Sequence, residues 1–253
     1  MSWHLADGTA VLCLSETEST NAEAVRRASM GLLGPLWILA ERQTRGRARR
    51  GRSWSSLDGN LFASLLIRPA MTPDQAALVS FAACLSVADL VDAVLGPAAA
   101  TLKWPNDVLA RGRKISGILL ESSASHGSLD WLVIGIGVNL IAKPEAGALR
   151  QGGTPATSLA EEGGAALSPI EALETLSARL THWLALLARE GFGPVRAAWL
   201  SRASHLGCTI GAGLPTERLE GIFEDVDATG SLVLRTPDDQ RRVIPAADIY
   251  FPD

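Results

Sequence analysis

Seven short apolar runs, separated by loops and by longer amphipathic stretches, constrain the fold of this chain more than any other feature of its sequence. Each run has the length and composition of a buried strand, and together they cover residues 9–14, 36–41, 60–69, 101–104, 107–110, 114–122 and 129–138. Helix starts are expected at Ser19 or Thr20, at Thr72-Pro73-Asp74 and at the capping-box sequence Ser168-Pro169-Ile170-Glu171, with a short helix near 194–202. The sequence therefore predicts an α+β fold.

The pattern of predicted secondary structure changes near residue 205. From Leu206 onward, short strand-like runs alternate with turn signals at Gly213, Gly230 and Pro237-Asp238, a spacing typical of a small β-barrel. A unit of roughly 45 residues is too small to bury a large core by itself. We therefore predict a main domain at 1–204 and a small C-terminal β-barrel domain at 205–253 that docks on it.

Composition limits the classes of function. The net charge is −4, whereas a non-specific nucleic-acid binder is more often basic overall. No run approaches the ~20 apolar residues that cross a bilayer, and the N-terminus lacks the features of a secretion signal. The scattered Cys13, Cys84 and Cys208 lie in apolar contexts, which favours buried thiols in a reducing compartment. We expect a cytoplasmic protein without a membrane partner.

The segment Glu41–Trp54, ERQTRGRARRGRSW, holds six arginines within eleven residues. These are Arg42, Arg45, Arg47, Arg49, Arg50 and Arg52. Neighbouring cations repel one another, so the segment is expected to be mobile until a polyanion orders it. Guanidinium groups and the N–H groups near Gly46 and Gly51 suit phosphate oxygens. By itself, the stretch is compatible with a nucleic-acid backbone, a phosphate-bearing small ligand or a solvated loop, and no Walker motif accompanies it.

Three further stretches place polar residues or glycines beside predicted strands. Lys103-Trp104-Pro105-Asn106-Asp107 joins two of the apolar runs and Lys114 begins the next, although Pro105 alone would explain the bend. Gly135 and Gly137 share one face of a strand, where a ligand or a helix approaches closely, and Asn139 ends that strand. Ser19-Thr20-Asn21 either caps a helix or binds a polar head group. None of these signals is specific when taken separately.

In this order, the stretches resemble the biotin protein ligase family. Gln43–Trp54 is similar to the family's run of glycines and arginines, and Lys103–Asp107 to its Lys-Trp-Pro-Asn-Asp. The remaining matching segments are Lys114–Glu121, Gly135–Asn139 and Ser19–Asn21, and the likeness extends over about residues 10–245. One departure is Ala48, where the family usually has glycine. A methyl group disfavours positive φ, so we expect the loop to close in a slightly different shape.

The resemblance implies a mixed-sheet biotin/lipoate ligase-like catalytic domain with helices packed on it, followed by an SH3-like β-barrel. It implies activation of biotin with MgATP to biotinyl-5′-AMP, and transfer of biotin to one lysine of a biotin carboxyl carrier protein or domain. The chain begins at the first strand of the catalytic domain, as in the monofunctional type, so no DNA partner is expected. The family includes monomers and homodimers joined by sheet edges. The alternatives are a lipoate–protein ligase and, in another class, an arginine-rich nucleic-acid-binding module.

The resemblance also implies roles for individual residues. Arg47, Arg49 and Arg50 would hold the biotin carboxylate and the phosphates, and Lys114 would bridge the carboxylate and the α-phosphate. Ser19, Thr20, Asn21 and Gln43 would bind the biotin head group above Gly135 and Gly137. Trp54 would cover the adenine, Gly46 and Gly117 would complete the binding set, and Asn106, Asp107 and Asn139 would serve the nucleotide or Mg²⁺, with Asp107 as the candidate metal ligand. Lys103 and Asp107 would help the acceptor lysine to lose its proton.

Overall fold

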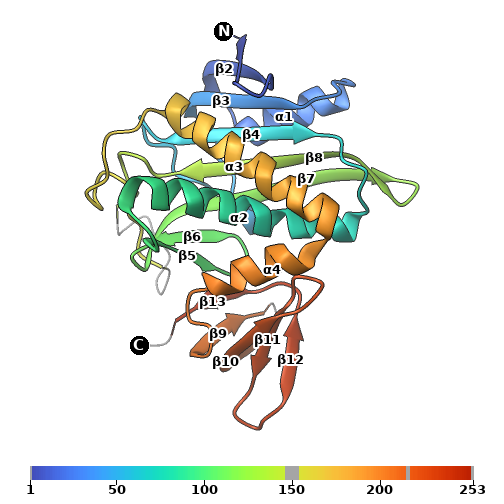
Figure 1. Cartoon of the computed structure of the whole chain (residues 1–253), viewed down its shortest axis with the longest axis vertical. Helices are drawn as coiled ribbons and strands as arrows, with labels where there is room; N and C mark the ends of the chain where they lie inside the picture. The colour runs from blue at the N-terminus through green and yellow to red at the C-terminus, as the bar shows by residue number, and fades with distance from the viewer. Residues whose placement is uncertain (1, 146–153, 215–216, 252–253) are drawn as a thin grey trace.

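An eight-stranded mixed sheet forms the centre of the computed structural model, which describes residues 2–145, 154–214 and 217–251 (Figure 1). Its strands are β1 (Ser2–His4), β2 (Ala10–Thr17), β3 (Leu36–Gln43), β4 (Leu61–Ile67), β5 (Ala100–Lys103), β6 (Asp107–Ala110), β7 (Arg113–Ser125) and β8 (Ser128–Val138). The order is β1-β2-β3-β4-β8-β7-β6-β5, and only the β2–β3 pair is parallel among these described strands. The seven expected runs are therefore confirmed as strands of a mixed sheet. The sequence missed β1, because three residues are too few to show a period.

Helices cover both faces of this sheet. α2 (Pro73–Leu95) packs on β5 to β8, α3 (Pro169–Glu190) packs on α2 and β4, and α4 (Phe192–Ser201) lies against both helices. α1 (Thr20–Ser29) packs on the opposite face, against β3, β4 and β8. The predicted starts are confirmed: Thr72 and Ser168 both form complete capping boxes, followed by proline in the first turn.

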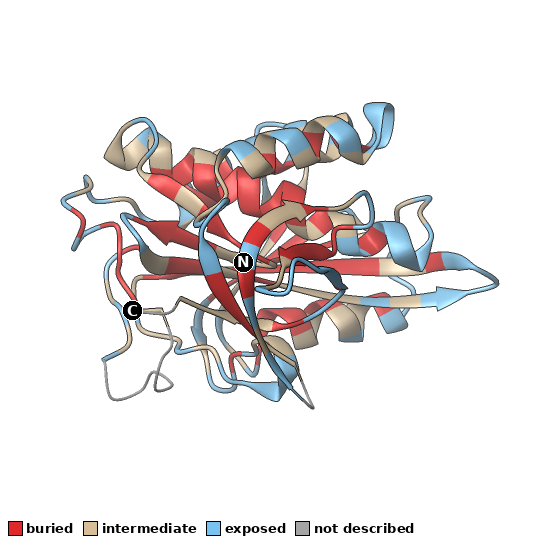
Figure 2. Ribbon diagram, turned by 90° about the horizontal axis from the view of Figure 1, so that it is seen from below, coloured by how far each residue is buried: buried red, intermediate tan, exposed pale blue. Residues whose placement is uncertain are grey.

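The main core lies between the sheet and the α2–α3 layer, and Figure 2 shows buried residues concentrated in the strands and in the helix faces turned toward them. The sequence analysis expected no apolar run long enough to cross a bilayer. α2 is nevertheless long enough, and it has a mean hydropathy of 2.0 over its most apolar window. Of that window, 61% is buried inside the fold. The helix is thus apolar because it is the central core helix, which packs against strands β5 to β8 and against α3 and α4.

A second, five-stranded antiparallel sheet follows α4 and forms the SH3-like unit expected from the sequence. Its strands are β9 (Thr209–Gly213), β10 (Arg218–Val226), β11 (Leu232–Arg235), β12 (Arg241–Ile244) and β13 (Asp248–Tyr250), in the order β12-β11-β10-β9-β13. The indole N–H of Trp104 donates to the Gly230 carbonyl at 2.9 Å, and Arg196 of α4 pairs with Asp225 at 2.5 Å. These bonds dock the unit against the β5–β6 turn and α4.

The cysteines differ in exposure more than the sequence suggested. None of them forms a disulfide within the described residues. Cys84 is buried in α2 and Cys13 is half-buried in β2. Cys208 is exposed, so the expectation that all three thiols are buried is wrong at this position.

Candidate active site

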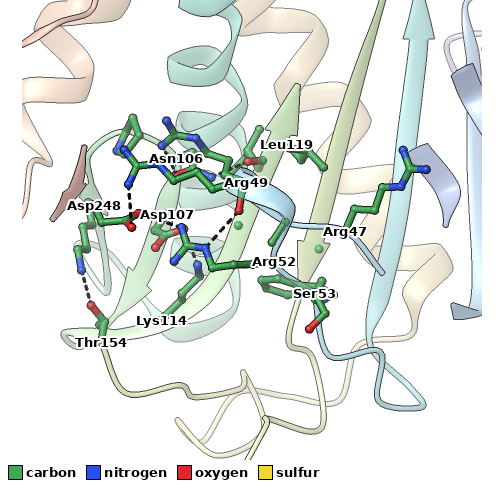
Figure 3. Close-up of a pocket in the computed structure, with 18 of the residues that line it drawn as sticks. Arg47, Arg49, Arg52, Ser53, Asn106, Asp107, Lys114, Leu119, Thr154 and Asp248 are labelled. Atoms are coloured by element: carbon green, nitrogen blue, oxygen red, sulfur yellow. Dashed lines mark hydrogen bonds and ion pairs between the residues drawn. The ribbon is translucent and has the colours of Figure 1, made fainter. Parts of the chain in front are cut away.

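A cavity of about 720 Å³ lies where the start of α1, the arginine-rich segment, the β5–β6 turn and strands β7 and β8 face the C-terminal unit. Figure 3 shows Arg49 and Arg52 of the segment beside Asn106, Asp107 and Lys114, whereas Arg47 points away from them. The predicted residues that line the cavity are Ser19, Thr20, Asn21, Gln43, Arg47, Arg49, Arg50, Trp54, Lys103, Asn106, Asp107, Lys114, Gly117, Gly135, Gly137 and Asn139. Residues far apart in the sequence are therefore brought to one cavity, and Gly46 is the one predicted residue outside its lining.

Gly46 shapes the base of the arginine-rich segment. Its carbonyl accepts a hydrogen bond from the Trp54 N–H at 2.9 Å. A Cβ at this position would lie 2.6 Å from the Trp54 carbonyl oxygen and 2.9 Å from the Ser56 hydroxyl. No side chain fits in this space unless the backbone moves, so the glycine is required by the close approach of two chain segments.

One end of the cavity is a cluster of buried hydroxyl and amide groups. Gln43 Oε1 accepts hydrogen bonds from the backbone N–H of Thr20 at 2.8 Å and from its hydroxyl at 3.2 Å. The fully buried Ser64 hydroxyl lies 2.6 Å from Asn21 Oδ1 and 2.8 Å from the Thr20 hydroxyl. The sequence analysis missed Ser64, although a lone hydroxyl within the apolar run 60–69 was a usable signal. The amide nitrogens donate within the protein, Asn21 Nδ2 to Glu121 at 2.8 Å and Gln43 Nε2 to Ser56 at 3.1 Å, so the cluster contains both donors and acceptors.

The glycines of β7 and β8 make room for two side chains. A Cβ on Gly135 would lie 1.9 Å from Asn21 Oδ1, and one on Gly137 would lie 2.6 Å from the Trp54 ring. Gly117 faces the same ring, with 3.1 Å between its hypothetical Cβ and the nearest ring atom. The indole Nε1 of Trp54 is buried and has no hydrogen-bond partner among the described residues. An unpaired donor of this kind suits a ligand acceptor.

The arginine-rich segment folds as a short loop whose two ends pair. Arg47 and Ser53 form an antiparallel bridge, and the Ala48 N–H donates to the Arg52 carbonyl at 2.7 Å. Ala48 has φ −134° and ψ 174°, which is extended backbone open to any residue. Ala48 therefore needs no left-handed backbone in this structure, and the expected difference in loop closure from the family stays a prediction. The left-handed conformation falls on Arg50, with φ 58°, and on Gly51, with φ 70°.

Five of the six arginines of the loop pair with carboxylates in this structure, and the expectation that the segment is mobile until a polyanion orders it stays a prediction. Carboxylate partners and their distances are Glu16 for Arg42 (3.7 Å), Glu18 for Arg45 (3.1 Å), Glu121 for Arg47 (3.2 Å), and Asp248 for both Arg50 and Arg52 (2.9 Å each). Arg49 instead donates to Asn106 Oδ1 at 3.2 Å. Burial, reinforced by the charge of Arg50, lowers the pKa of Arg49. Its guanidinium stays charged and is the least compensated cation of the loop among these described contacts.

Lys114 and Asp107 form a close ion pair inside the cavity, with 2.6 Å between Lys114 Nζ and Asp107 Oδ1. The pair follows from the strands, because Asp107 begins β6 and lies opposite Gly117 in the neighbouring β7. Asn106 sits beside it and uses both amide atoms within the protein: Nδ2 donates to the Ile118 carbonyl at 2.7 Å, and Oδ1 accepts from Arg49. Asn106 therefore fixes the turn and the loop in this structure.

Lys103 is the most deeply buried cation of the cavity, with 7% of its surface exposed. Its Nζ donates to the Thr154 hydroxyl at 2.6 Å and lies 4.7 Å from the centre of the Phe251 ring. Burial lowers the pKa of Lys103 to about 8, against the opposing effect of the Asp107 carboxylate. This amine is thus partly neutral at mildly alkaline pH and is able to take up a proton.

Asn139 holds the segment that closes one side of the cavity. Its Nδ2 donates to the Thr157 carbonyl at 2.9 Å, and its backbone carbonyl accepts from the Leu159 N–H at 3.0 Å. The same segment pairs with β7, because the Lys114 N–H donates to the Pro155 carbonyl at 2.6 Å and the Thr157 N–H donates to the Lys114 carbonyl at 2.9 Å. Asn139 thereby helps to fix the backbone of Lys114.

The C-terminal unit supplies a wall of the cavity that the sequence analysis did not predict. Arg218 from β10 and Asp248, Tyr250 and Phe251 from β13 and its end line it. Within this wall, Asp248 contributes most to balancing the positive charge of the arginine-rich loop, because its carboxylate pairs with two of the loop arginines. No local pattern distinguished this aspartate from others in the C-terminal unit, because its role depends on how the two sheets are docked.

Comparison with known families gives two matches along the chain. The family described as Biotin/lipoate A/B protein ligase matches residues 12–139. The family described as Biotin protein ligase C terminal domain matches residues 205–251. The first match covers the helix start, the arginine-rich loop and the lysines of the cavity, and the second covers the C-terminal sheet.

Individual relatives agree with these matches. A biotin–[acetyl-CoA-carboxylase] ligase from Paracoccus denitrificans is 46% identical over 239 residues, which are 94% of this chain and 99% of that protein. A protein of the same name from Mycobacterium tuberculosis is 34% identical, over 87% of this chain and 81% of its own length. Among solved structures, the biotin protein ligase of Aquifex aeolicus in complex with biotin and ATP superposes with a TM-score of 0.80, at 24% identity over 96% of this chain and 99% of that one.

Proposed function

Because the chain belongs to the biotin/lipoate A/B protein ligase family, we infer that it is a biotin–[acetyl-CoA-carboxylase] ligase. It activates biotin with MgATP to biotinyl-5′-AMP and transfers biotin to a lysine of a biotin carrier domain. The observation that carries this inference is the cavity itself, where a buried hydroxyl–amide cluster, an arginine loop and a lysine–aspartate pair meet. The 46% identical relative is a biotin ligase, which favours biotin over lipoate.

We propose that the buried cluster binds the ureido head of biotin. A ureido group has two N–H donors and one carbonyl acceptor, so it needs acceptors and donors side by side. Asn21, Thr20 and Gln43 provide both within a few ångströms. Ser19 lies next to them, is 1% exposed and makes no capping bond with its side chain. Ser64 holds the orientation of the Asn21 amide.

The charged end of the cavity suits the first step. A biotin carboxylate oxygen attacks the α-phosphorus of ATP, the bond to the bridging oxygen breaks, and pyrophosphate leaves with the electron pair. Negative charge grows on the phosphate oxygens, and fixed cations stabilise it. Arg47, Arg49 and Arg50 are proposed to bind these oxygens, with the ligand anions replacing the protein carboxylates that pair with Arg47 and Arg50 in this structure.

Lys114 is proposed to bridge the attacking carboxylate and the α-phosphate. Its Nζ shares the cavity with the Trp54 ring, 5.8 Å from the ring centre, and with Asp107. Trp54 would then cover the adenine or the neighbouring part of the adenylate, with its unpaired N–H available to an acceptor of the ligand.

Magnesium enters as part of the substrate MgATP. Mg²⁺ keeps several waters and takes only one or two carboxylates in addition to the phosphates. No group of three or more histidine, cysteine or acidic side chains arranged for a metal occurs among the described residues. Asp107 is the carboxylate we propose for this ion, and binding it would compete with the Lys114 ion pair. A single protein carboxylate is a suitable ligand for a Mg²⁺ ion that the phosphates of ATP already coordinate.

In the second step the acceptor lysine loses a proton and attacks the carbonyl carbon of biotinyl-AMP, and AMP leaves. A protein amine with a pKa near neutrality is a suitable base. Lys103, with its pKa lowered to about 8 by burial, is our proposed base, and Asp107 stands beside it. Lys103 is protonated below that pKa and neutral above it, so the transfer rate should rise with pH through this range.

Replacing Gly135 with alanine is expected to weaken biotin binding by roughly 100-fold, since an added Cβ at 1.9 Å from Asn21 Oδ1 forces this amide out of the cluster and overpacking costs about 1–3 kcal/mol. Isothermal titration with biotin measures the loss. Gly193→Ala is a matched control, because nothing lies within 4 Å of its hypothetical Cβ. Unchanged biotin affinity in Gly135→Ala would contradict the assignment of this cluster.

We also propose the division into a catalytic domain at 1–204 and a C-terminal domain at 205–253, supported by the two sheets and by the docking contacts between them. The loop arginines pair with carboxylates at the cavity, which supports a small anionic ligand over DNA as their partner. A homodimer through a sheet edge and a cytoplasmic location remain predictions. Light scattering of the purified protein tests the first, and fractionation of cells tests the second.

The decisive experiment incubates the protein with biotin, MgATP and a biotin carrier domain, followed by streptavidin blotting and mass spectrometry. The expected product is a carrier with one biotin on one lysine. A parallel reaction with lipoate tests the rival ligase, and lipoylation without biotinylation would overturn the assignment. Binding to nucleic acid without ATP, with a steep dependence on salt, would instead support the other class.

A further inference from the structure

Lys103 is enclosed by chain segments that are remote from one another in the sequence. Thr154 precedes the segment that pairs with Lys114, and Phe251 follows the last strand of the C-terminal unit. The Lys103 amine lies between them, 2.6 Å from the Thr154 hydroxyl oxygen and 4.7 Å from the Phe251 ring centre. Both contacts attract the ammonium form, but the Phe251 ring also excludes water from the amine, and burial is the largest influence on the pKa of Lys103.

The ring of Phe251 is itself held in place. His205 stacks on it with 3.6 Å between ring centres and 15° between planes. The segment before His205 is fixed to β5, because Leu102 exchanges backbone hydrogen bonds with Arg202 and Ser204, each at 2.8 Å. Burial, together with the charge of Lys103, lowers the pKa of His205, so this ring is mainly neutral and stacks as an aromatic surface. The ring pair covers Lys103 from the side of the C-terminal unit.

Charged groups on several elements face the same amine. The carboxylates of Asp107 on β6 and Asp248 on β13 favour its ammonium form, whereas Lys114 on β7 and Arg52 of the loop oppose it. These effects partly cancel, and burial is the largest influence. The side chains that exclude water from Lys103 therefore control its protonation more than any single charge does.

We propose that Thr154 and Phe251 are positioning residues for Lys103, which together hold its amine in the cavity and set how readily it accepts the proton of the carrier lysine. The proposal rests on the role of Lys103 in transfer inferred above. In that step the acceptor nitrogen forms a bond to the biotinyl carbonyl carbon, and the bond from this carbon to the AMP oxygen breaks. AMP leaves with the electron pair, and the proton of the acceptor passes to Lys103.

The two partners act on Lys103 with opposite sign. Phe251→Leu admits water, so the pKa of Lys103 should rise by roughly one unit toward its ordinary range. Thr154→Val keeps the shape but removes the acceptor, so the pKa should fall by roughly half a unit to one unit. Thr154→Ser and Phe251→Tyr keep the hydroxyl and the aromatic face, respectively, and should titrate like the unchanged protein. A purely structural role would not give shifts in opposite directions.

The chain allows these titrations to be read directly, because Lys103, Lys114 and Lys143 are its only lysines. Lysine labelled with ¹³C at the ε position gives three side-chain signals in the full-length protein, and Lys143→Arg assigns the exposed one. The Lys103 signal should titrate near pH 8 and move as described in the two variants. The pH profile of single-turnover biotin transfer to the carrier domain should move with it.

Each outcome decides the proposal. A Lys103 signal that titrates in its ordinary range, or that stays in place in both Thr154→Val and Phe251→Leu, overturns it. Shifts of the NMR titration without a matching shift of the transfer profile overturn the link to proton transfer. Failure of the proposed function is separate, because it would appear as an unlabelled carrier with the unchanged protein, whatever the lysine signals show. If Phe251→Leu does not fold, the downward shift in Thr154→Val alone decides.

Discussion

Replacing Lys114 with alanine is expected to slow the formation of biotinyl-AMP by roughly 100- to 1,000-fold, the loss typical for one fixed group that stabilises developing charge. The variant also leaves the Asp107 carboxylate without the ammonium that lies 2.6 Å away in this structure. An unpaired carboxylate at that point repels the phosphates of ATP. Pyrophosphate release in the absence of carrier measures the first step alone.

Two further variants give this measurement its controls. Lys143→Arg changes the lysine whose amine pairs with Glu161 and does not line the cavity, so pyrophosphate release should stay within about 2-fold of the unchanged rate. Lys114→Arg keeps a cation beside the Asp107 carboxylate and should retain more of the rate than Lys114→Ala. Pyrophosphate release from Lys114→Ala at the unchanged rate would remove Lys114 from the reaction.

Arg49→Gly is expected to leave the fold intact but to release biotinyl-AMP roughly 10- to 100-fold faster, which corresponds to one charge-assisted hydrogen bond. Arg49 ties the loop to Asn106 on the β5–β6 turn and carries the least compensated charge of the loop among the described contacts. Its loss removes both the tether and a cation over the phosphate. The escaped mixed anhydride should then acylate lysines of bystander proteins.

Mass spectrometry of a bystander such as serum albumin measures that labelling, and rapid filtration measures release of the intermediate. Arg45→Gly is a matched control, because Arg45 lies in the same loop but pairs with Glu18 outside the cavity lining. It should keep the intermediate bound and the bystander unlabelled. Equal release from both variants would mean that flexibility of the loop, and not the Arg49 contact, retains the adenylate.

Local signals were sufficient for the secondary structure of the main sheet and its helices, with the exception of β1. The capping boxes at Thr72 and Ser168 and the apolar runs specified helices and strands because each depends on residues close in the sequence. The residues that line the cavity could be predicted equally well where several of them are consecutive in the sequence, as in Ser19-Thr20-Asn21. Ser64 was missed because it is a single hydroxyl residue within an apolar strand. Only the fold shows that its hydroxyl faces Asn21.

The partners of the charged groups could not be predicted. Asp248 is 196 residues from Arg52 and belongs to the other sheet, so no local pattern pairs them. The sequence consequently suggested a loop of mutually repelling arginines, and the structure supplies carboxylates from β7 and β13. The same reason hid Thr154, which reaches Lys103 through the segment that pairs with β7, and Phe251, which reaches it from the end of the C-terminal sheet.

Glu121 and Asp248 have a further consequence for selectivity among the anions of a cell. Both carboxylates already occupy arginines of the loop in this structure. A small competitor such as chloride or inorganic phosphate gains one arginine while displacing a carboxylate of similar charge, so it has little net advantage. MgATP with biotin presents a triphosphate and a carboxylate together and can replace several of these contacts in one event. On the binding roles proposed for these arginines, the resident carboxylates set a threshold that only a polyvalent ligand passes.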